Sequence, residues 1–387
     1  MIKKPKVAIV VDAFYPMRDG VVEVVNRYAT GLMENFEVHV ITIFAGKNAF
    51  DDSVLPYKVW RAKSFKIPFT QYRFPMPNYD RKLFRKLDEE KFDLFHINSP
   101  YPLGYVIAKY AKKNNIPIIS SFHTQYARDI YKITRSKPIT KLVVKSMMKV
   151  YNNANLCLTM SDFTKKLYSE YGGTTTCEIL PNAPCLSMPK TSLDNLRAKV
   201  KEEYQLSDNL TFLFAGRITA DKGIFFALDV VKKLRDDGLD FTMLFVGSGL
   251  LEKKLNRKIK KYKLQDRVKT LGLVSDKEKL LALYSIADLF IFPSVYDTDG
   301  IVKREAAFVN TPSICIKDTG AGSDIIDNEN GYLAENNAIL FAEKIKEVVA
   351  DMDKLYEVGK RANKDLCFSF DEINAKLNCY YQKVMGN

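Results

Sequence analysis

The sequence lacks a long apolar run, a cysteine pair motif and more than a few histidines, and each absence excludes a class of protein. Among its 387 residues no run of about 18 apolar residues occurs, so no segment is expected to span a bilayer. The short apolar run near the start predicts a first strand rather than a secretory signal. The three histidines (His39, His96 and His123) are too scattered to indicate a zinc site. Its six cysteines form no Cys-x-x-Cys pair and are expected to be reduced thiols of a cytosolic protein.

Acidic residues are scarce in the first half of the chain. Residues 1–190 hold 29 Lys and Arg against 16 Asp and Glu, so the whole formal charge of +13 lies there. Between Asp129 and Asp162 there is no acidic residue at all. This asymmetry predicts that the first half faces a polyanion, either nucleic acid or an anionic membrane surface. No helix-turn-helix, RNA-binding aromatic signature or zinc finger accompanies the charge, so no nucleic-acid partner is expected.

Length and the alternation of strands with helices predict two α/β domains. Strands are expected at residues 6–12, 37–43, 93–97, 117–121, 210–215, 241–246, 268–274, 289–292 and 313–316. Such alternation indicates parallel sheets covered by helices on both faces. The segment from Pro184 to about Leu206 loses the strand periodicity and is the expected connection between the domains.

The strongest chemical signal lies between Ile291 and Pro312. A buried strand is followed by the polar loop Asp297–Gly300, and a helix is expected to open at Ile301. Free backbone N–H groups and the helix dipole make such a helix start an anion site. Asp297 and Glu305 stand eight positions apart on either side of that turn. Because carboxylates repel phosphates, sugar hydroxyls are the expected partners of these two acids.

A second anion site is predicted at residues 216–223, where Gly-Arg-x4-Lys-Gly follows a strand. Arg217 and Lys222 flank the start of the next helix, where their charges and the backbone N–H groups suit a diphosphate. Gly247 follows the next strand, and Val274 ends the one after it. His123 ends the strand at residues 117–121, on the sheet edge where ligands of open α/β sheets bind.

Together these motifs resemble the retaining glycosyltransferases of the GT-B fold, family 4, over nearly the full length. Asp297 and Glu305 match that family's acid-x7-acid motif, although Asp297 stands where the family usually has Glu. Thr298 and Gly300 suit the Glu-Thr-Gln-Gly variant of the membrane-lipid glucosyltransferases. The resemblance implies two Rossmann-like domains facing across a cleft. The expected boundaries are 1–186 for the acceptor domain, 187–364 for the nucleotide-sugar domain, and 365–387 for a last helix that crosses back to the first domain.

The resemblance also implies roles. Glu305 would hold the ribose, Asp297 the transferred sugar, and His123 would lie beside the reacting sugar. Gly300, Ile301 and Val302 would add N–H donors at the helix start. The implied catalytic residues are His123, Asp297, Arg217 and Lys222. The implied donor-binding residues are Gly20, Arg217, Lys222, Gly247, Val274, Asp297, Gly300, Ile301, Val302 and Glu305. Neither a metal nor another cofactor is implied, because the basic groups neutralise the diphosphate.

A basic stripe suggests how the first domain meets its acceptor. Lys137, Lys141, Lys145 and Lys149 recur at four-residue spacing, which places them on one face of a helix. With neighbouring apolar residues this pattern suits an anionic membrane interface, and a solvated helix face is the alternative. A second basic and aromatic stretch runs from Lys58 to Lys86.

The sequence therefore predicts a nucleotide-sugar hexosyltransferase that moves a hexose, glucose from UDP-glucose, to a lipid such as diacylglycerol or glycosyl-diacylglycerol. It would be cytoplasmic and peripheral on the inner face of the membrane. Two alternatives stay open: a transferase of envelope polysaccharide synthesis with a soluble or undecaprenyl-linked acceptor, and a non-catalytic basic binding protein of the same fold.

Overall fold

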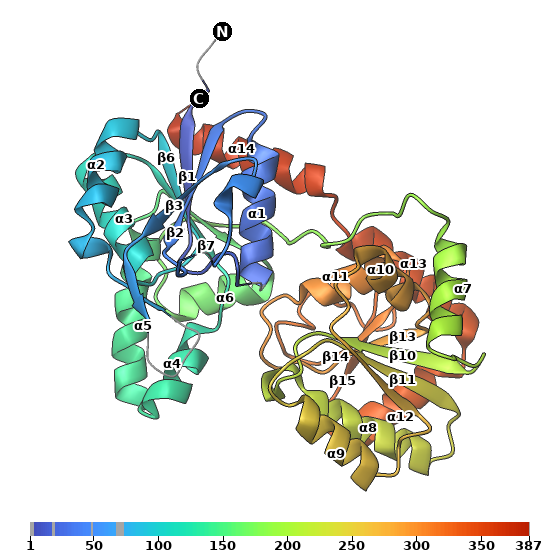
Figure 1. Cartoon of the computed structure of the whole chain (residues 1–387). Coiled ribbons are helices and arrows are strands. Elements are labelled where there is room, and N and C mark those ends of the chain that lie inside the picture. Colours follow the sequence, from blue (N-terminus) through green and yellow to red (C-terminus); the bar gives the residue numbers. More distant parts are fainter. Residues whose placement is uncertain (1–3, 18–19, 48, 67–72, 387) are drawn as a thin grey trace. The chain divides into compact units, whose positions relative to one another are not determined.

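The computed structural model describes residues 4–17, 20–47, 49–66 and 73–386, and it divides into two compact units. The first unit comprises residues 1–182 and 370–387, and the second comprises residues 183–369. Each unit is a parallel sheet with helices on both faces (Figure 1). The two sheets agree with the predicted α/β, Rossmann-like class. Part of the Lys58–Lys86 stretch, residues 67–72, lies outside the described residues.

The first unit is built on a seven-stranded sheet of order β3-β2-β1-β6-β7-β8-β9, in which neighbouring strands are parallel. Its strands are β1 (Lys6–Val10), β2 (Glu37–Ile43), β3 (Lys58–Ala62), β6 (Leu94–Ile97), β7 (Ile118–Phe122), β8 (Leu156–Thr159) and β9 (Cys177–Ile179). A separate antiparallel pair is formed by β4 (Ser64–Lys66) and β5 (Arg73–Pro75). Its helices are α1 (Gly20–Leu32), α2 (Arg81–Glu90), α3 (Pro102–Lys113), α4 (Tyr126–Thr134), α5 (Lys137–Asn152), α6 (Asp162–Glu170) and α14 (Phe370–Met385).

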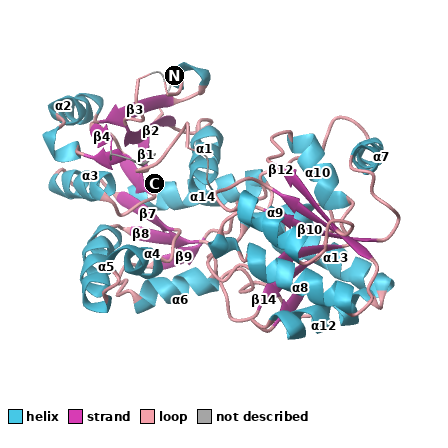
Figure 2. Cartoon of the chain, turned by 60° about the horizontal axis from the view of Figure 1, so that its bottom comes forward, coloured by secondary structure: helices cyan, strands magenta, loops and turns pink. Residues whose placement is uncertain are grey.

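The second unit is built on a six-stranded parallel sheet of order β12-β11-β10-β13-β14-β15. Its strands are β10 (Leu210–Ala215), β11 (Phe241–Val246), β12 (Val268–Gly272), β13 (Leu289–Phe292), β14 (Ser313–Ile316) and β15 (Tyr332–Ala334). Its helices are α7 (Leu193–Glu203), α8 (Ile224–Asp236), α9 (Glu252–Lys261), α10 (Lys277–Ser285), α11 (Ile301–Phe308), α12 (Ala338–Val349) and α13 (Met352–Leu366). Helices α8 and α12 cover one face, and α10, α11 and α13 cover the other (Figure 1). Figure 2, which colours the strands magenta, shows the sheet of this unit from a second side.

The central strands of both sheets are buried on both faces. Strands β1, β10, β11 and β13 are buried almost throughout, as expected of strands covered on both faces. Helix α6 begins with a capping box, in which the Ser161 hydroxyl accepts from Thr164 N and the Thr164 hydroxyl accepts from Ser161 N.

The basic segment after His123 forms two helices, α4 and α5. Arg135 takes the left-handed conformation, with φ of 52°, and ends α4. Pro138 lies in the first turn of α5, where a missing N–H costs nothing. All four stripe lysines consequently lie on α5 alone.

The domain boundaries differ slightly from those predicted. The first unit ends at Asn182 rather than at residue 186, and the last helix begins at Phe370 rather than at residue 365. Helix α13 runs on to Leu366, so the chain leaves the second unit only after that residue. Helix α14 packs with α1 in the first unit, where the Tyr381 hydroxyl lies 2.8 Å from Nδ1 of the buried His96.

We predict that Tyr381→Phe destabilises the first unit. The change leaves one ring nitrogen of the buried His96 without its partner, which costs roughly 1–3 kcal/mol of unfolding free energy. Trp60 is the single tryptophan and is buried in the first unit, so its fluorescence during urea unfolding reports on that unit. Tyr380→Phe on the same helix is the matched control, and an equal midpoint for both variants would contradict the role of the hydrogen bond.

Candidate nucleotide-sugar site

The predicted donor-binding residues of the second unit gather at one edge of its sheet. Arg217 and Lys222 follow β10, Gly247 follows β11, and Val274 follows β12. Residues 297–302 follow β13, which lies next to β10 in the sheet. The chain order reverses across β10, so this edge is a topological switch point, where open α/β sheets bind ligands.

At two positions of this edge the backbone lies too close to its neighbours for any residue but glycine. Gly247 has φ of 131°, and a Cβ there would lie 1.9 Å from the carbonyl oxygen of Gly216. Gly300 has φ of 79°, and a Cβ there would lie 2.4 Å from the ring of Phe292. Only glycine fits either position, which explains the two glycines that the sequence pattern singles out.

The two motifs of the second unit meet through one ion pair. Nζ of Lys222 lies 2.5 Å from Oδ1 of Asp297, and both side chains are mostly buried. The other carboxylate oxygen, Asp297 Oδ2, is buried and has no hydrogen-bond partner among the described residues. A buried carboxylate oxygen without a partner is costly, and a donor from a bound ligand would satisfy it.

Helix α11 begins directly after the Asp297 loop. Gly300 precedes it, and no side-chain hydrogen bond caps its first turn within the described residues. The N–H groups of Ile301 and Val302 therefore lie at the positive end of the helix dipole. Glu305, one turn later, is buried and accepts a hydrogen bond of 2.9 Å from the Tyr284 hydroxyl.

Arg217 is placed differently from Lys222. Its side chain is exposed, and its guanidinium makes no hydrogen bond or ion pair with the residues that the structure describes. Val274 is half-buried beyond the end of β12. The structure thus brings Lys222 and Asp297 into contact, while Arg217 and Val274 follow neighbouring strands at the same sheet edge.

Sequence reasoning missed a buried charge network behind the loop. Nη2 of Arg304 lies 2.5 Å from Oδ1 of Asp299 and 2.7 Å from Oδ2 of Asp324. Its Nη1 donates to the Leu366 carbonyl oxygen at 2.8 Å. Lys303 is fully buried, contacts Asp324 and donates to the Ala321 carbonyl oxygen at 2.6 Å. The two carboxylates raise the pKa of Arg304 further above its usual range, although burial opposes them.

In the first unit, His123 lies just past the end of β7 and is buried. Its Nε2 lies 3.0 Å from Oδ1 of Asn98, a residue that follows β6. Asp12 follows β1, accepts hydrogen bonds from Ser99 and Leu103, and has its pKa raised to about 6 by burial. The polar Asn98-Ser99 pair directly after a buried strand was the signal that could have identified these neighbours.

Gly20 is the exposed first residue of α1, and residues 18 and 19 of the same loop lie outside the described part.

Among the described residues, one group brings metal-ligand atoms together, namely Glu37, His39 and Glu90. Lys58 and Lys6 form ion pairs with its two glutamates, and these cations would repel a metal ion. That group lies near the amino ends of β1 and β2, away from His123.

Comparison with known proteins identifies the family. A model of "Glycosyltransferase Family 4" matches residues 18–183, and a model of "Glycosyl transferases group 1" matches residues 197–365. The chain is therefore a family 4-like glycosyltransferase of the GT-B fold, an enzyme that transfers a hexose from a nucleotide sugar.

Curated relatives resemble the chain over most of its length. An alpha-monoglucosyldiacylglycerol synthase of Acholeplasma laidlawii is 24% identical over 92% of each chain. A protein of the same name from Streptococcus pneumoniae is 23% identical over 92% of this chain and 84% of that protein. Anabaena HepE, solved in complex with UDP, superposes with a TM-score of 0.78 at 16% identity and covers 98% of this chain and 100% of its own.

We predict that the first unit loses stability as the pH falls from about 6.5 toward 4. Burial lowers the pKa of His123 to about 4 and that of His96 to about 3. The unfolded chain, with histidine pKa values near 6.5, then binds protons that the folded chain does not. Each histidine contributes a slope of up to about 1.4 kcal/mol per pH unit in that window. Asp12, whose pKa burial raises to about 6, offsets one of the two histidines, so the net change is still a loss.

Urea unfolding followed by Trp60 fluorescence at several pH values measures this slope. His123→Asn cannot titrate, so its unfolding free energy should change less steeply with pH than that of the wild type. Identical slopes would show that His123 is not held neutral by burial.

Proposed function

We propose that the protein transfers glucose from UDP-glucose, with retention of the anomeric configuration, to a membrane lipid such as diacylglycerol or glycosyl-diacylglycerol. The observation that carries the donor part is the contact between Lys222 and Asp297 at the switch point of the second sheet, beside the unpartnered oxygen of Asp297. Lys222 is a cation that could bind a phosphate, and Asp297 Oδ2 could accept a hydrogen bond from a sugar hydroxyl. The UDP bound to Anabaena HepE supports a uridine nucleotide.

The residues of the site suggest how the reaction proceeds. The acceptor hydroxyl attacks the anomeric carbon from the face that the diphosphate leaves, and its proton passes to the departing phosphate oxygen. The bond to the diphosphate breaks as the new bond forms, so negative charge grows on the leaving group. Lys222, Arg217 and the N–H groups at Ile301 and Val302 would stabilise that charge. Asp297 Oδ2 would accept a hydrogen bond from the glucose. We assign no metal to this step, because these groups supply the positive charge that the diphosphate needs.

The remaining residues have supporting roles in this proposal. Glu305, fixed by the Tyr284 hydroxyl, would hold the ribose hydroxyls. Gly20, Gly247 and Gly300 would let the backbone approach the donor, and Val274 would contact the base. His123 is neutral at pH 7 because burial lowers its pKa to about 4, so it would act on the sugar as a neutral imidazole.

The lipid acceptor is supported by the names of the two relatives that align over most of the chain. The excess charge of residues 1–190 gives independent support, since an anionic membrane surface attracts a basic domain. We therefore propose that the protein works as a peripheral enzyme on the inner face of the membrane. The described residues include no helix that is both long and apolar enough to cross a bilayer.

A donor and acceptor screen tests this function directly. Purified protein is incubated with UDP-glucose, other UDP-sugars or GDP-sugars, and diacylglycerol is offered in neutral detergent micelles. We expect UDP release and an α-glucosyl lipid only with UDP-glucose and diacylglycerol. Transfer to a soluble or undecaprenyl-linked saccharide instead, without lipid product, would favour a role in envelope polysaccharide synthesis.

We predict that Lys222→Ala or Arg217→Ala lowers turnover by roughly 100-fold or more, as expected when a donor to developing negative charge is lost. Lys222→Ala should have the larger effect, because it also leaves Asp297 without its cation. Lys199→Ala, an exposed lysine of α7 in the same unit, is the matched control. Near-normal turnover in both variants would remove these residues from the diphosphate site.

A further inference from the structure

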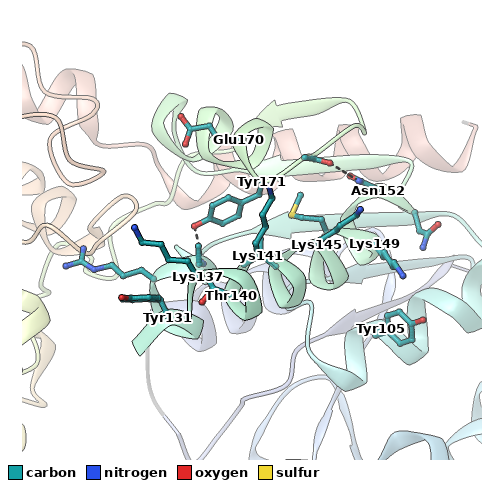
Figure 3. Close-up of a pocket in the computed structure, with 16 residues that line it drawn as sticks. Tyr105, Tyr131, Lys137, Thr140, Lys141, Lys145, Lys149, Asn152, Glu170 and Tyr171 are labelled. Carbon is teal, nitrogen blue, oxygen red and sulfur yellow. Dashed lines mark hydrogen bonds between the residues drawn. The ribbon is translucent and has the colours of Figure 1, made fainter. Parts of the chain in front are cut away.

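The four stripe lysines do not lie on an open helix face. Lys137, Lys141, Lys145 and Lys149 line a groove of about 1200 Å³ in the first unit. Figure 3 shows these side chains leaving successive turns of α5 along the groove. The other walls come from Tyr105 of α3, from α4, and from Glu170 and Tyr171 at the end of α6.

The charge of the groove is unbalanced. Five basic side chains line it, and Glu170 is the only acid among the described residues that do so. None of the four lysines makes an ion pair or a hydrogen bond with a described residue, whereas nearby Lys132 lies 3.8 Å from Asp129. Like charges four residues apart destabilise a helix. Four such cations in one concave surface therefore indicate an anionic ligand that offsets their repulsion.

The groove and its edge are also apolar. Val144 and Met148 are buried beneath the lysines, and Tyr131 lies at one end. Outside the groove, at the corner where α4 meets α5, Ile133 is 80% exposed, Ile139 50% and Leu142 69%. Large apolar side chains exposed beside a cationic surface are typical of proteins that insert into a membrane interface.

We propose that this groove binds the phosphate-bearing headgroup of one anionic phospholipid molecule while the corner of Ile133, Ile139 and Leu142 enters the bilayer. The inference rests on the membrane association proposed above, and it adds a discrete site to it. If the attraction were diffuse, every exposed lysine of the unit would contribute equally to the affinity for anionic lipid. If the site is discrete, the affinity depends on the lysines that line the groove and on the shape of the groove.

Short-chain lipids kept below their critical micelle concentration distinguish a discrete site from diffuse attraction to a membrane surface. The probes are dihexanoyl phosphatidic acid, the zwitterionic dihexanoyl phosphatidylcholine, and glycerol 3-phosphate, which carries the same phosphate without acyl chains. We expect calorimetry on the full chain to show one site for phosphatidic acid and at least tenfold weaker binding of the other two. Equal binding of glycerol 3-phosphate would identify a free phosphate ester as the ligand and overturn the lipid assignment, and no binding of phosphatidic acid would overturn the site.

Matched variants locate the site. The double variant Lys141→Gln/Lys145→Gln removes two groove lysines, and at about fivefold per lysine it should weaken binding to anionic vesicles roughly 25-fold. The control Lys165→Gln/Lys166→Gln removes the same charge from exposed lysines of α6 that do not line the groove. Its binding should fall less than threefold. Equal losses in the two double variants would show diffuse attraction and overturn the proposal.

A third variant tests the shape without changing the charge. Ala127 is half-buried and lines the groove, so Ala127→Phe narrows it, and Ala127→Ser is its control. We expect Ala127→Phe to lose phosphatidic acid binding, with Trp60 fluorescence unchanged as a check on folding. Retained binding would place the ligand elsewhere.

The failure of this inference can be told apart from failure of the proposed function. Glucosyl transfer to diacylglycerol in neutral detergent micelles requires no anionic lipid. If the groove variants transfer normally there but bind vesicles like the wild type, only the groove assignment fails. If the wild type binds phosphatidic acid but transfers no glucose with any acceptor, the proposed function fails and the lipid site stands.

Discussion

The sheet edge that carries the predicted donor-binding residues of the second unit depends on a set of buried charges that must all remain paired. Lys303 and Arg304 lie inside the protein on α11, and Asp299 and Asp324 are their partners. Removing one member would leave a buried charge uncompensated, at a cost of roughly 3–5 kcal/mol. Since Asp299 belongs to the loop that carries Asp297, and Arg304 precedes Glu305, the network fixes both acids of the motif to the turn after β14 and to the end of α13.

That constraint acts on a site assembled by parallel sheet geometry. Parallel strands bring their carboxyl ends to one edge, so loops that are distant in the chain meet there. Lys222 and Asp297 are 75 residues apart and form an ion pair because β10 and β13 are neighbours. The first unit repeats the arrangement, with Asn98 after β6 and His123 after β7 in hydrogen-bond contact. In both units the fold supplies the position, and a few polar side chains supply the chemistry.

Much of this could be predicted from the sequence, and the rest had a physical reason to be missed. Strands β2, β10, β11 and β14 follow from apolar runs bounded by turns, and the Gly-Arg-x4-Lys-Gly and acid-x7-acid patterns mark the donor edge. Lys303 and Arg304 could not be placed in the core, because charged residues are almost never fully buried unless they are paired, and their partners are distant in the chain. The break between α4 and α5 was overlooked, although Pro138 signalled it. The spacing of the stripe lysines predicted that they share one helix face. The groove itself could not be predicted, because its other walls come from α3, α4 and α6.

The two units also treat positive charge differently. Many lysines of the second unit have carboxylate partners, among them Lys222, Lys232, Lys233, Lys258, Lys279 and Lys346. Residues 191–387, which include nearly all of that unit, hold 30 basic and 30 acidic residues, so they offer little long-range attraction to a polyanion. The excess of the first half includes the four α5 lysines, which lack partners among the described residues and converge on one groove. Positive charge that served only solubility would be spread over the surface. The four α5 lysines instead lie together beside exposed apolar side chains, which argues for a ligand that is both anionic and amphiphilic.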